Sequence, residues 1–310
     1  MQVLGIDIGG TSIKGALVNE NGNLNKSFSL MIDKKLNQID QIKSLILKIR
    51  ETYQDNEFDG IGLGIPGAVN PTTGIILFSN NLKWENLEIG SIFTKEFPSK
   101  KIAMDNDANV AALGEVTFGS AKDEKNVVLI TLGTGVGSGI IIDGKIYEGE
   151  NGRGAEIGHS LLVMDGIKCT CGRNGCFEMY ASASALIRQA NEACKSRPNS
   201  RLAKAKEIKE LDGKTIFEIA KKGCKTAQKV VDNYVKYLSE GLINICNIFR
   251  PSSIVLSGGI ANQGDYLINK IENYLMLNTY GFPPAAKVNI KCASLGYNSG
   301  IIGAASLVLK

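Results

Sequence analysis

Residues 3–18 read VLGIDIGGTSIKGALV, and they align without a gap on residues 127–142, which read VVLITLGTGVGSGIII. Each stretch is an apolar segment, a tight turn of glycine and threonine, and a second apolar segment, which predicts a β-hairpin. In the alignment Gly9 falls on Gly133. Such hairpins are common, so a chance pair is the alternative, but two ungapped copies favour a duplicated domain with one loop from each half facing a cleft.

The rest of the chain alternates between strand and helix signals, which is typical of an α/β protein. Apolar residues at helical spacing predict an amphipathic helix over residues 36–53 and a long buried helix over residues 230–246. An Ala-rich helix is predicted from Asp107 to residue 116, and buried strands over residues 60–65 and 253–256. The polar stretch 195–214 is predicted to be a surface connection with a helical piece.

The length of 310 residues favours two domains, because single hydrophobic cores stop growing near ~250–300 residues. A composition of 44% hydrophobic and 21% charged residues is that of an ordinary globular protein. The net charge is only +4, without a dense Lys/Arg run, so no nucleic-acid partner is expected.

The seven cysteines are an odd number, and the first residues, MQVLGIDIGG, lack the basic start and cleavage site of a signal peptide. These features predict a reducing, cytoplasmic setting with thiols or metal ligands in place of disulfides. Apolar stretches such as residues 60–82 are broken by Pro66 and Pro71, so no membrane span is expected.

The glycine turns are candidate phosphate-binding loops, because successive backbone N–H groups form a nest for anions. Asp7 ends the first strand beside such a turn, and a carboxylate among phosphates implies Mg²⁺. No GxxxxGK[ST] motif occurs, and no GxGxxG opens a helix, so neither a Walker A loop nor a Rossmann site is expected. The candidate nucleotide residues are Gly9, Gly10, Thr11, Gly133, Thr134, Gly135, Gly137, Gly258 and Gly259.

Acidic and amide side chains precede the Ala-rich helix, in the sequence MDNDAN over residues 104–109. Asp and Asn at a helix start cap free N–H groups, which accounts for one or two of them. Phosphoryl transfer needs a group that orients the attacking hydroxyl and accepts its proton. Asp107 is the candidate base, and Asn106 a candidate hydrogen-bonding partner of the substrate.

Residues 156–178 read EIGHSLLVMDGIKCTCGRNGCFE and combine the single histidine with three of the seven cysteines. A Cys₃His set is a standard tetrahedral site for structural zinc; the alternative is three unrelated buried thiols. The predicted zinc ligands are His159, Cys169, Cys171 and Cys176, and the remaining cysteines are predicted to be core residues. Glu156 and Glu178 can accept hydrogen bonds from hydroxyl groups, although each taken alone suits an exposed surface charge.

The glycine hairpins and the late SGG turn at residues 257–259 resemble the superfamily of actin, the heat-shock ATPase and sugar kinases. The whole set of motifs resembles the ROK family (repressors, open reading frames, kinases) closely. The matching motifs, in chain order, are DIGGT, GIPGAV at 64–69, NLKW at 81–84, DNDANVAALGE at 105–115, LGTGVGSG at 132–139, EIGH at 156–159, CTCGRNGCFE at 169–178 and LSGGI at 256–260.

The resemblance implies two ribonuclease-H-like domains around a nucleotide and sugar cleft: a small one over residues 1–118 plus about 300–310, and a large one over residues 119–299. It implies a kinase that moves the γ-phosphoryl of MgATP to the 6-hydroxyl of a hexose. Asp107 would be the general base, and Asp7, Lys14 and the glycine loops would hold ATP and Mg²⁺. The sugar hydroxyls would be bound by Asn81, Asn106, Asp107, Glu156, His159 and Glu178, with His159 also a zinc ligand.

Glucose is the favoured substrate, and family kinases for N-acetylglucosamine, N-acetylmannosamine, fructose and allose are the alternatives. Family repressors carry a helix-turn-helix before the first hairpin; here the hairpin begins at Val3, so we expect a kinase. A non-catalytic sugar-binding protein is a further alternative. The resemblance implies a homo-oligomer, dimer or tetramer, and leaves polyphosphate open as a phosphoryl donor.

Overall fold

The structure is a computed structural model, and it describes residues 1–281 and 287–309. Residues 282–286 and Lys310, which the predicted domains include, lie outside it. The chain forms two compact units: the first contains Met1–Lys125, Gly139–Ala155 and the segment from Ser294 onward, and the second contains Asn126–Ser138 and Glu156–Ala293. The domain limits expected from the resemblance remain predictions.

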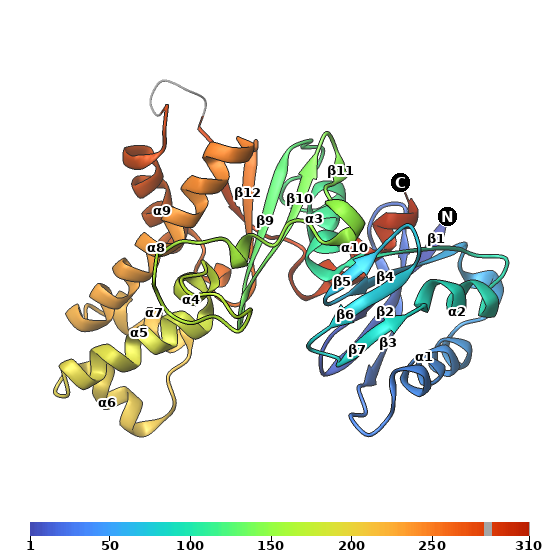
Figure 1. Cartoon of the computed structure of the whole chain (residues 1–310), viewed down its shortest axis with the longest axis horizontal. Coiled ribbons are helices and arrows are strands. Elements are labelled where there is room, and N and C mark those ends of the chain that lie inside the picture. Colours follow the sequence, from blue (N-terminus) through green and yellow to red (C-terminus); the bar gives the residue numbers. More distant parts are fainter. Residues whose placement is uncertain (282–286, 310) are drawn as a thin grey trace. The chain divides into compact units, whose positions relative to one another are not determined.

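The first unit is built on a five-stranded sheet with the order β3-β2-β1-β4-β8 (Figure 1). The hairpin predicted from the opening stretch is confirmed, because β1 and β2 pair antiparallel. β4 adds parallel to β1, and β8 adds parallel to β4. The strands are β1 (Gln2–Ile8), β2 (Ser12–Asn19), β3 (Leu24–Met31), β4 (Gly60–Ile65) and β8 (Lys101–Asn106).

Helix α1 (Gln38–Thr52) begins two residues later than the predicted range of 36–53. The reason is the cap: the side chain of Asn37 accepts a hydrogen bond from the backbone N–H of Asp40, which ends the preceding loop. Its apolar face, with Ile42, Leu45 and Ile49, enters the main core of this unit. The unit also contains α2 (Ile89–Glu96), α3 (Asp107–Phe118) and a small sheet of β5 (Ala68–Asn70), β6 (Ile75–Ser79) and β7 (Trp84–Leu87).

Helix α10 (Ser299–Leu309) packs its backbone directly against the strands of the first sheet. Its Ile301, Ala305 and Val308 form a core cluster with residues of β1 and β2. A Cβ on Gly62 would lie 1.8 Å from the Ala304 carbonyl oxygen, and one on Gly5 would lie 2.1 Å from that of Ile301. Both strand positions therefore require glycine, since any side chain would push α10 off the sheet.

The second sheet has the order β11-β10-β9-β12-β13, in which β9, β12 and β13 are parallel (Figure 1). Its first hairpin, β9–β10, is the predicted copy of β1–β2. The strands are β9 (Val127–Leu132), β10 (Val136–Ile142), β11 (Lys145–Ile146), β12 (Ser253–Ser257) and β13 (Asn289–Cys292). The helices are α4 (Glu178–Ala181), α5 (Ala183–Ser196), α6 (Arg201–Ile208), α7 (Gly213–Lys221), α8 (Lys225–Phe249) and α9 (Asp265–Asn278).

Helix α8 contains the predicted long buried helix, with Tyr234, Leu238 and Leu242 fully buried. Helix α6 is the helical piece predicted within residues 195–214. A search of the described residues finds no helix with the length and apolar character that a membrane span requires.

The side chain of Glu115, near the end of α3, is completely buried, and its hydrogen bonds hold the segment that precedes α10 in place. Its carboxylate accepts hydrogen bonds from the backbone N–H groups of Ser120, Ser294 and Leu295, at 2.7, 3.0 and 2.9 Å. The hydroxyls of both serines are also within hydrogen-bond distance. One buried side chain therefore satisfies several backbone donors that have no strand or helix partner.

We expect Glu115→Ala to lower the free energy of unfolding by about 3 kcal/mol or more, because it leaves buried donors unsatisfied at ~1–3 kcal/mol each. Denaturant unfolding measures the change. Glu85→Ala, which removes an exposed carboxylate from β7, is the comparison. An unfolding free energy for Glu115→Ala within 0.5 kcal/mol (roughly the scatter of surface substitutions) of the unsubstituted protein would contradict this role.

Candidate functional site

The first glycine turn (residues 9–11) connects β1 and β2 and is held at both ends by the backbone. The N–H of Gly9 donates to the carbonyl of Ser12 at 2.9 Å, and the carbonyl of Thr11 accepts from Ile32 at 3.0 Å. A Cβ on Gly10 would meet only the Cβ of Asn81, at 3.6 Å. The structure thus places the predicted sugar-binding Asn81 beside the predicted phosphate turn.

Asp7, at the end of β1, lies across the hairpin from Lys14 and near Asp107. Desolvation and, after it, the negative charge of Asp107 together raise the pKa of Asp7 to about 6, and Lys14 opposes the shift. The predicted Mg²⁺ carboxylate and the predicted base therefore share one electrostatic environment, in which a cation would be favourable.

Asp107 is the first residue of α3, and Asn106 is its N-cap. The side-chain oxygen of Asn106 accepts from the backbone N–H groups of Ala108 and Asn109, and its amide nitrogen donates to the carbonyl of Gly67 at 2.9 Å. One amide hydrogen is left for a ligand. Asn106 thus caps α3, as the alternative for part of this motif had it, and its predicted contact with the substrate stays a prediction.

Asp107 is exposed, but partial desolvation by the surrounding protein raises the pKa of its carboxyl, although the N–H of Ala108 donates to it at 2.9 Å. A carboxylate of raised pKa is a stronger proton acceptor than one of ordinary pKa, provided that it is ionised. This environment suits the predicted role of a general base.

Asp105 is a residue that sequence reasoning missed. Its side chain is 2% exposed and accepts from the backbone N–H of Asn106 at 2.6 Å and from the amide of Asn109 at 2.8 Å. Burial raises its pKa to about 6, opposed by these hydrogen bonds, while Glu148 adds to the rise. It positions the start of α3; the sequence showed it only as one of the acidic and amide residues of MDNDAN, without a role of its own.

The second glycine loop (residues 133–135) connects β9 and β10, and Gly137 of the predicted site lies at the start of β10. Three backbone N–H groups here donate within the protein. That of Gly133 donates to the carbonyl of Gly135 at 3.1 Å, that of Val136 to the carboxylate of Glu178 at 3.0 Å, and that of Gly137 to the hydroxyl of Thr131 at 3.0 Å. The N–H groups of Thr134 and Gly135 have no partner among the described residues. Two adjacent donors are therefore available to an anion.

A cavity of about 650 Å³ adjoins this loop within the second unit. It is lined by three of the predicted nucleotide residues, Gly133, Thr134 and Gly259. Sequence reasoning missed the polar side chains that complete the lining from α7 and the turn after β12. These side chains are Asp212, Lys214, Glu218, Lys221, Asn262 and Gln263.

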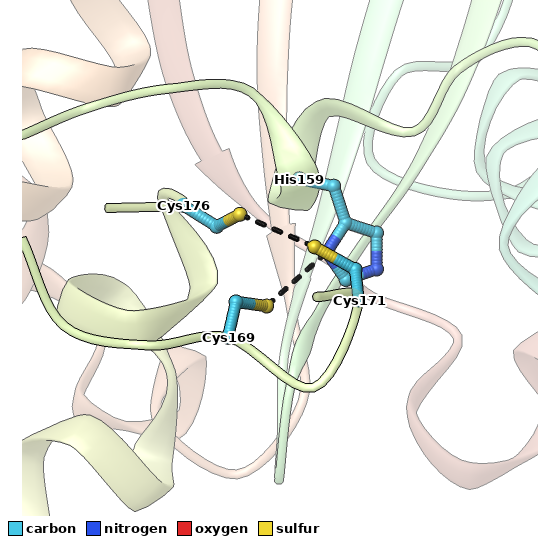
Figure 2. A group of neighbouring side chains, drawn as sticks. All are labelled: His159, Cys169, Cys171 and Cys176. Carbon is cyan, nitrogen blue, oxygen red and sulfur yellow. Dashed lines mark hydrogen bonds between the residues drawn. The ribbon is translucent and has the colours of Figure 1, made fainter. Parts of the chain in front are cut away.

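The predicted zinc ligands come together as one cluster, shown in Figure 2. Their ligand atoms all lie within 4.8 Å of one another; the Sγ of Cys169 is 3.6 Å from Nδ1 of His159, and the Sγ atoms of Cys171 and Cys176 are 3.5 Å apart. A zinc tetrahedron with Zn–S near ~2.3 Å and Zn–N near ~2.0 Å separates neighbouring ligand atoms by roughly 3.5–3.8 Å. We call these four residues the Cys-His cluster; its geometry is consistent with a zinc site.

The thiols of the Cys-His cluster differ in their environment. The backbone N–H of Arg173 lowers the pKa of the exposed Cys171, whereas burial raises the pKa of Cys176 to about 12. A metal binds thiolates, so an ion entering the cluster must release protons. The described cysteines outside the cluster are also free thiols; Cys194, Cys224 and Cys246 are buried, as predicted, and Cys292 is partly exposed.

The two predicted glutamates flank the Cys-His cluster in the sequence. Glu156 is exposed, and its carbonyl accepts from the backbone N–H of His159 at 3.1 Å. Glu178 is half-buried, with one carboxylate oxygen bound to the N–H of Val136 and the other 4.0 Å from the Sγ of Cys169. The predicted site residues thus fall into two groups, one in each unit.

The repeated sheet plan and the two glycine turns are those of the actin-like ATPase fold. The chain belongs to the ROK family, whose model matches residues 3–310. A glucokinase of Halalkalibacterium halodurans is 34% identical over 315 residues, which cover 98% of this chain and 94% of that protein. A xylose repressor of Bacillus spizizenii is 30% identical over 99% of this chain and 77% of its own length.

Among solved structures, the ROK family glucokinase from Streptomyces griseus, in complex with glucose and AMPPNP, superposes with a TM-score of 0.83. It is 29% identical, and the alignment covers 99% of both chains. The predicted fold class, α/β with ribonuclease-H-like units, and the resemblance to the ROK family are thereby confirmed.

Proposed function

We propose that this protein is an ATP-dependent hexokinase that transfers the γ-phosphoryl group of MgATP to the 6-hydroxyl of a hexose, most specifically glucose. The observation that carries the proposal is the joint environment of Asp7 and Asp107, a half-buried and an exposed carboxylate beside a glycine turn, both with a raised pKa. Phosphoryl transfer requires a cation, phosphate-binding amides and a group that orients the attacking hydroxyl. The similarity to glucokinases supports the choice of glucose.

In this proposal Asp107 accepts the proton of the attacking sugar hydroxyl. The other sugar hydroxyls are held by Asn81, Asn106, Glu156, His159 and Glu178. Asp7, Lys14 and the first glycine turn face the phosphates with Mg²⁺, which supplies charge neutralisation when bound. The second glycine loop, Gly258 and Gly259 bind the rest of the nucleotide, and the cavity beside Thr134 is large enough for a nucleoside.

The Cys-His cluster is the proposed site of a structural zinc ion. Four protein ligands complete a tetrahedron and leave no open position, so the ion would order the loop and take no part in the reaction. Nδ1 is the ring nitrogen of His159 that lies beside the Sγ of Cys169. The other ring nitrogen, Nε2, therefore remains for a sugar hydroxyl.

The test is ADP release across a panel of glucose, fructose, allose, mannose, N-acetylglucosamine and N-acetylmannosamine, with ATP or polyphosphate as donor. We expect the highest kcat/KM with glucose and ATP. A preference for an N-acetylhexosamine would move the assignment to another ROK kinase. Sugar binding without ADP release would favour a non-catalytic binding protein. Light scattering on the same samples tests the expected dimer or tetramer.

We expect kcat/KM to fall as the pH drops below about 6. Desolvation and the charge of Asp107 raise the pKa of Asp7 to about 6, desolvation raises that of Asp107, and Asp107 accepts a proton only when it is ionised. The acid limb should therefore lie well above the ~4 of ordinary carboxyl groups. A pH–rate profile that is flat down to pH 5 would contradict the proposed environment of the base.

A further inference from the structure

The short helix α4 connects the Cys-His cluster with the second glycine loop. It begins two residues after the ligand Cys176, and the backbone N–H of Met179 donates to the carbonyl of Cys176 at 3.0 Å. Only Phe177 separates the last cluster ligand from Glu178. A shift of Cys176 would therefore also move Glu178, the first residue of α4.

The same segment holds the second glycine loop at both of its ends. The carboxylate of Glu178 accepts from the N–H of Val136 at 3.0 Å, and the N–H of Ala183, just after α4, donates to the carbonyl of Gly133 at 2.8 Å. A Cβ on Gly135 would lie 2.1 Å from the carboxylate oxygen of Glu178 that binds Val136. The backbone at Gly135 therefore packs directly against this carboxylate. The amides of Thr134 and Gly135 lie between these two fixed points.

The second oxygen of Glu178 faces the metal-binding side. It lies 4.0 Å from the Sγ of Cys169, which belongs to the Cys-His cluster. Four thiol and imidazole groups without an ion can turn about their side-chain bonds, whereas a tetrahedral ion fixes each of them. An ion in the cluster thus fixes both Cys169, beside Glu178, and Cys176, at the start of α4.

We propose that Glu178 couples the Cys-His cluster to the second glycine loop, so that metal occupancy sets the affinity of this loop for a nucleoside diphosphate in the absence of sugar. The inference rests on the proposed function only in taking that loop as a phosphate-binding loop. Glu178 is then a positioning residue for the nucleotide, in addition to its proposed contact with the sugar.

The competing arrangement is an α4 that its own packing holds in place. Phe177 is fully buried against Gly241, and the hydroxyl of Tyr180 accepts from the N–H of Ile167 at 2.8 Å. If these anchors suffice, removal of the metal leaves the nucleotide affinity unchanged. The experiment must therefore measure how the metal changes the affinity for the nucleotide, and not the catalytic activity.

The experiment is calorimetric titration of the full-length protein with MgADP, without sugar, before and after removal of the metal by a chelator. We expect the dissociation constant of the unsubstituted protein to rise at least about 5-fold on metal removal, the lower end of usual couplings. In Glu178→Ala the two dissociation constants should agree within 2-fold. Equal affinities in the unsubstituted protein, or undiminished coupling in Glu178→Ala, would overturn the inference.

Two control variants separate the hydrogen bond from the charge. Glu178→Gln keeps an oxygen that can accept from Val136 and should retain most of the coupling. Glu192→Ala removes an exposed carboxylate from α5 and should retain all of it. Loss of coupling in Glu192→Ala would show that the effect is not specific to Glu178, against the inference.

A second measurement covers the case in which the metal-free protein does not fold. Coupling of two binding sites is reciprocal, so MgADP must tighten the binding of the metal by the same factor. In a competition between the cluster and a chelator for Co²⁺, followed by the cobalt absorption bands, MgADP should lower the Co²⁺ dissociation constant of the unsubstituted protein at least about 5-fold and leave that of Glu178→Ala unchanged. An equal Co²⁺ affinity with and without MgADP in the unsubstituted protein would overturn the inference.

The outcomes separate this inference from the proposed function. A protein that phosphorylates a hexose but binds MgADP equally with and without metal contradicts only the coupling. A protein that shows the coupling but phosphorylates no sugar on the panel contradicts only the kinase assignment.

Discussion

Asp107→Asn is expected to lower kcat by about 10³-fold, within the usual range of ~10²–10⁴ for the loss of a general base, while sugar affinity changes little. Asparagine has the shape of aspartate, and its side-chain oxygen can still accept the hydrogen bond that the N–H of Ala108 donates. The substitution therefore removes the proton acceptor and preserves the start of α3. Single-turnover ADP production gives the rate, and calorimetry with the sugar gives the affinity.

The matched control is Asp265→Asn, because Asp265 is likewise the first residue of a helix, α9. It should leave kcat unchanged, and this would show that the effect belongs to Asp107 and not to the loss of any acidic residue at a helix start. Near-normal ADP production by Asp107→Asn would remove Asp107 from the role of base. A matching loss of sugar affinity would instead indicate that the carboxylate mainly binds substrate.

The second large effect is expected from Cys176→Ala, which should reduce the zinc content from about one ion per chain to nearly none. The substitution removes a buried ligand from the Cys-His cluster, and metal-binding energy contributes to folding stability. We expect the melting temperature to fall by roughly 10 °C, as a loss of several kcal/mol implies for a chain of this size. Elemental analysis and calorimetry measure the two quantities.

Cys194→Ala is the comparison for this variant, since Cys194 is a buried free thiol outside the cluster. It should keep its zinc and lose only the stability that a small cavity costs. A fully stable and active Cys176→Ala protein without metal would contradict a structural zinc site.

The features that could be predicted from the sequence are those set by neighbouring residues. The hairpin β1–β2 follows from a glycine turn between two apolar segments, and α1 follows from an apolar period with a capping Asn37. The Cys-His cluster was predictable because a metal site demands particular side chains, and three of its ligands lie within eight residues. In these cases local chemistry leaves few alternatives.

The features that were missed depend on partners far along the chain. Glu115 meets Ser294 179 residues later, and Glu178 meets Val136 42 residues earlier, contacts that no local pattern encodes. The sequence offered both a cap and a substrate contact for Asn106, and only the bond to Gly67 shows how little of its amide remains free. The positions of such side chains are decided by tertiary packing, not by periodicity.

The packing of α10 on β1 and β4 has a consequence for how the chain folds during synthesis. Domains usually fold from the N-terminal one onward as the chain emerges. Here α10, which packs against Gly5 and Gly62 of the first sheet, is translated only after all of residues 126–293. The second unit can therefore fold first, while the face of the first sheet that α10 covers stays exposed to water until the end of the chain has been synthesised.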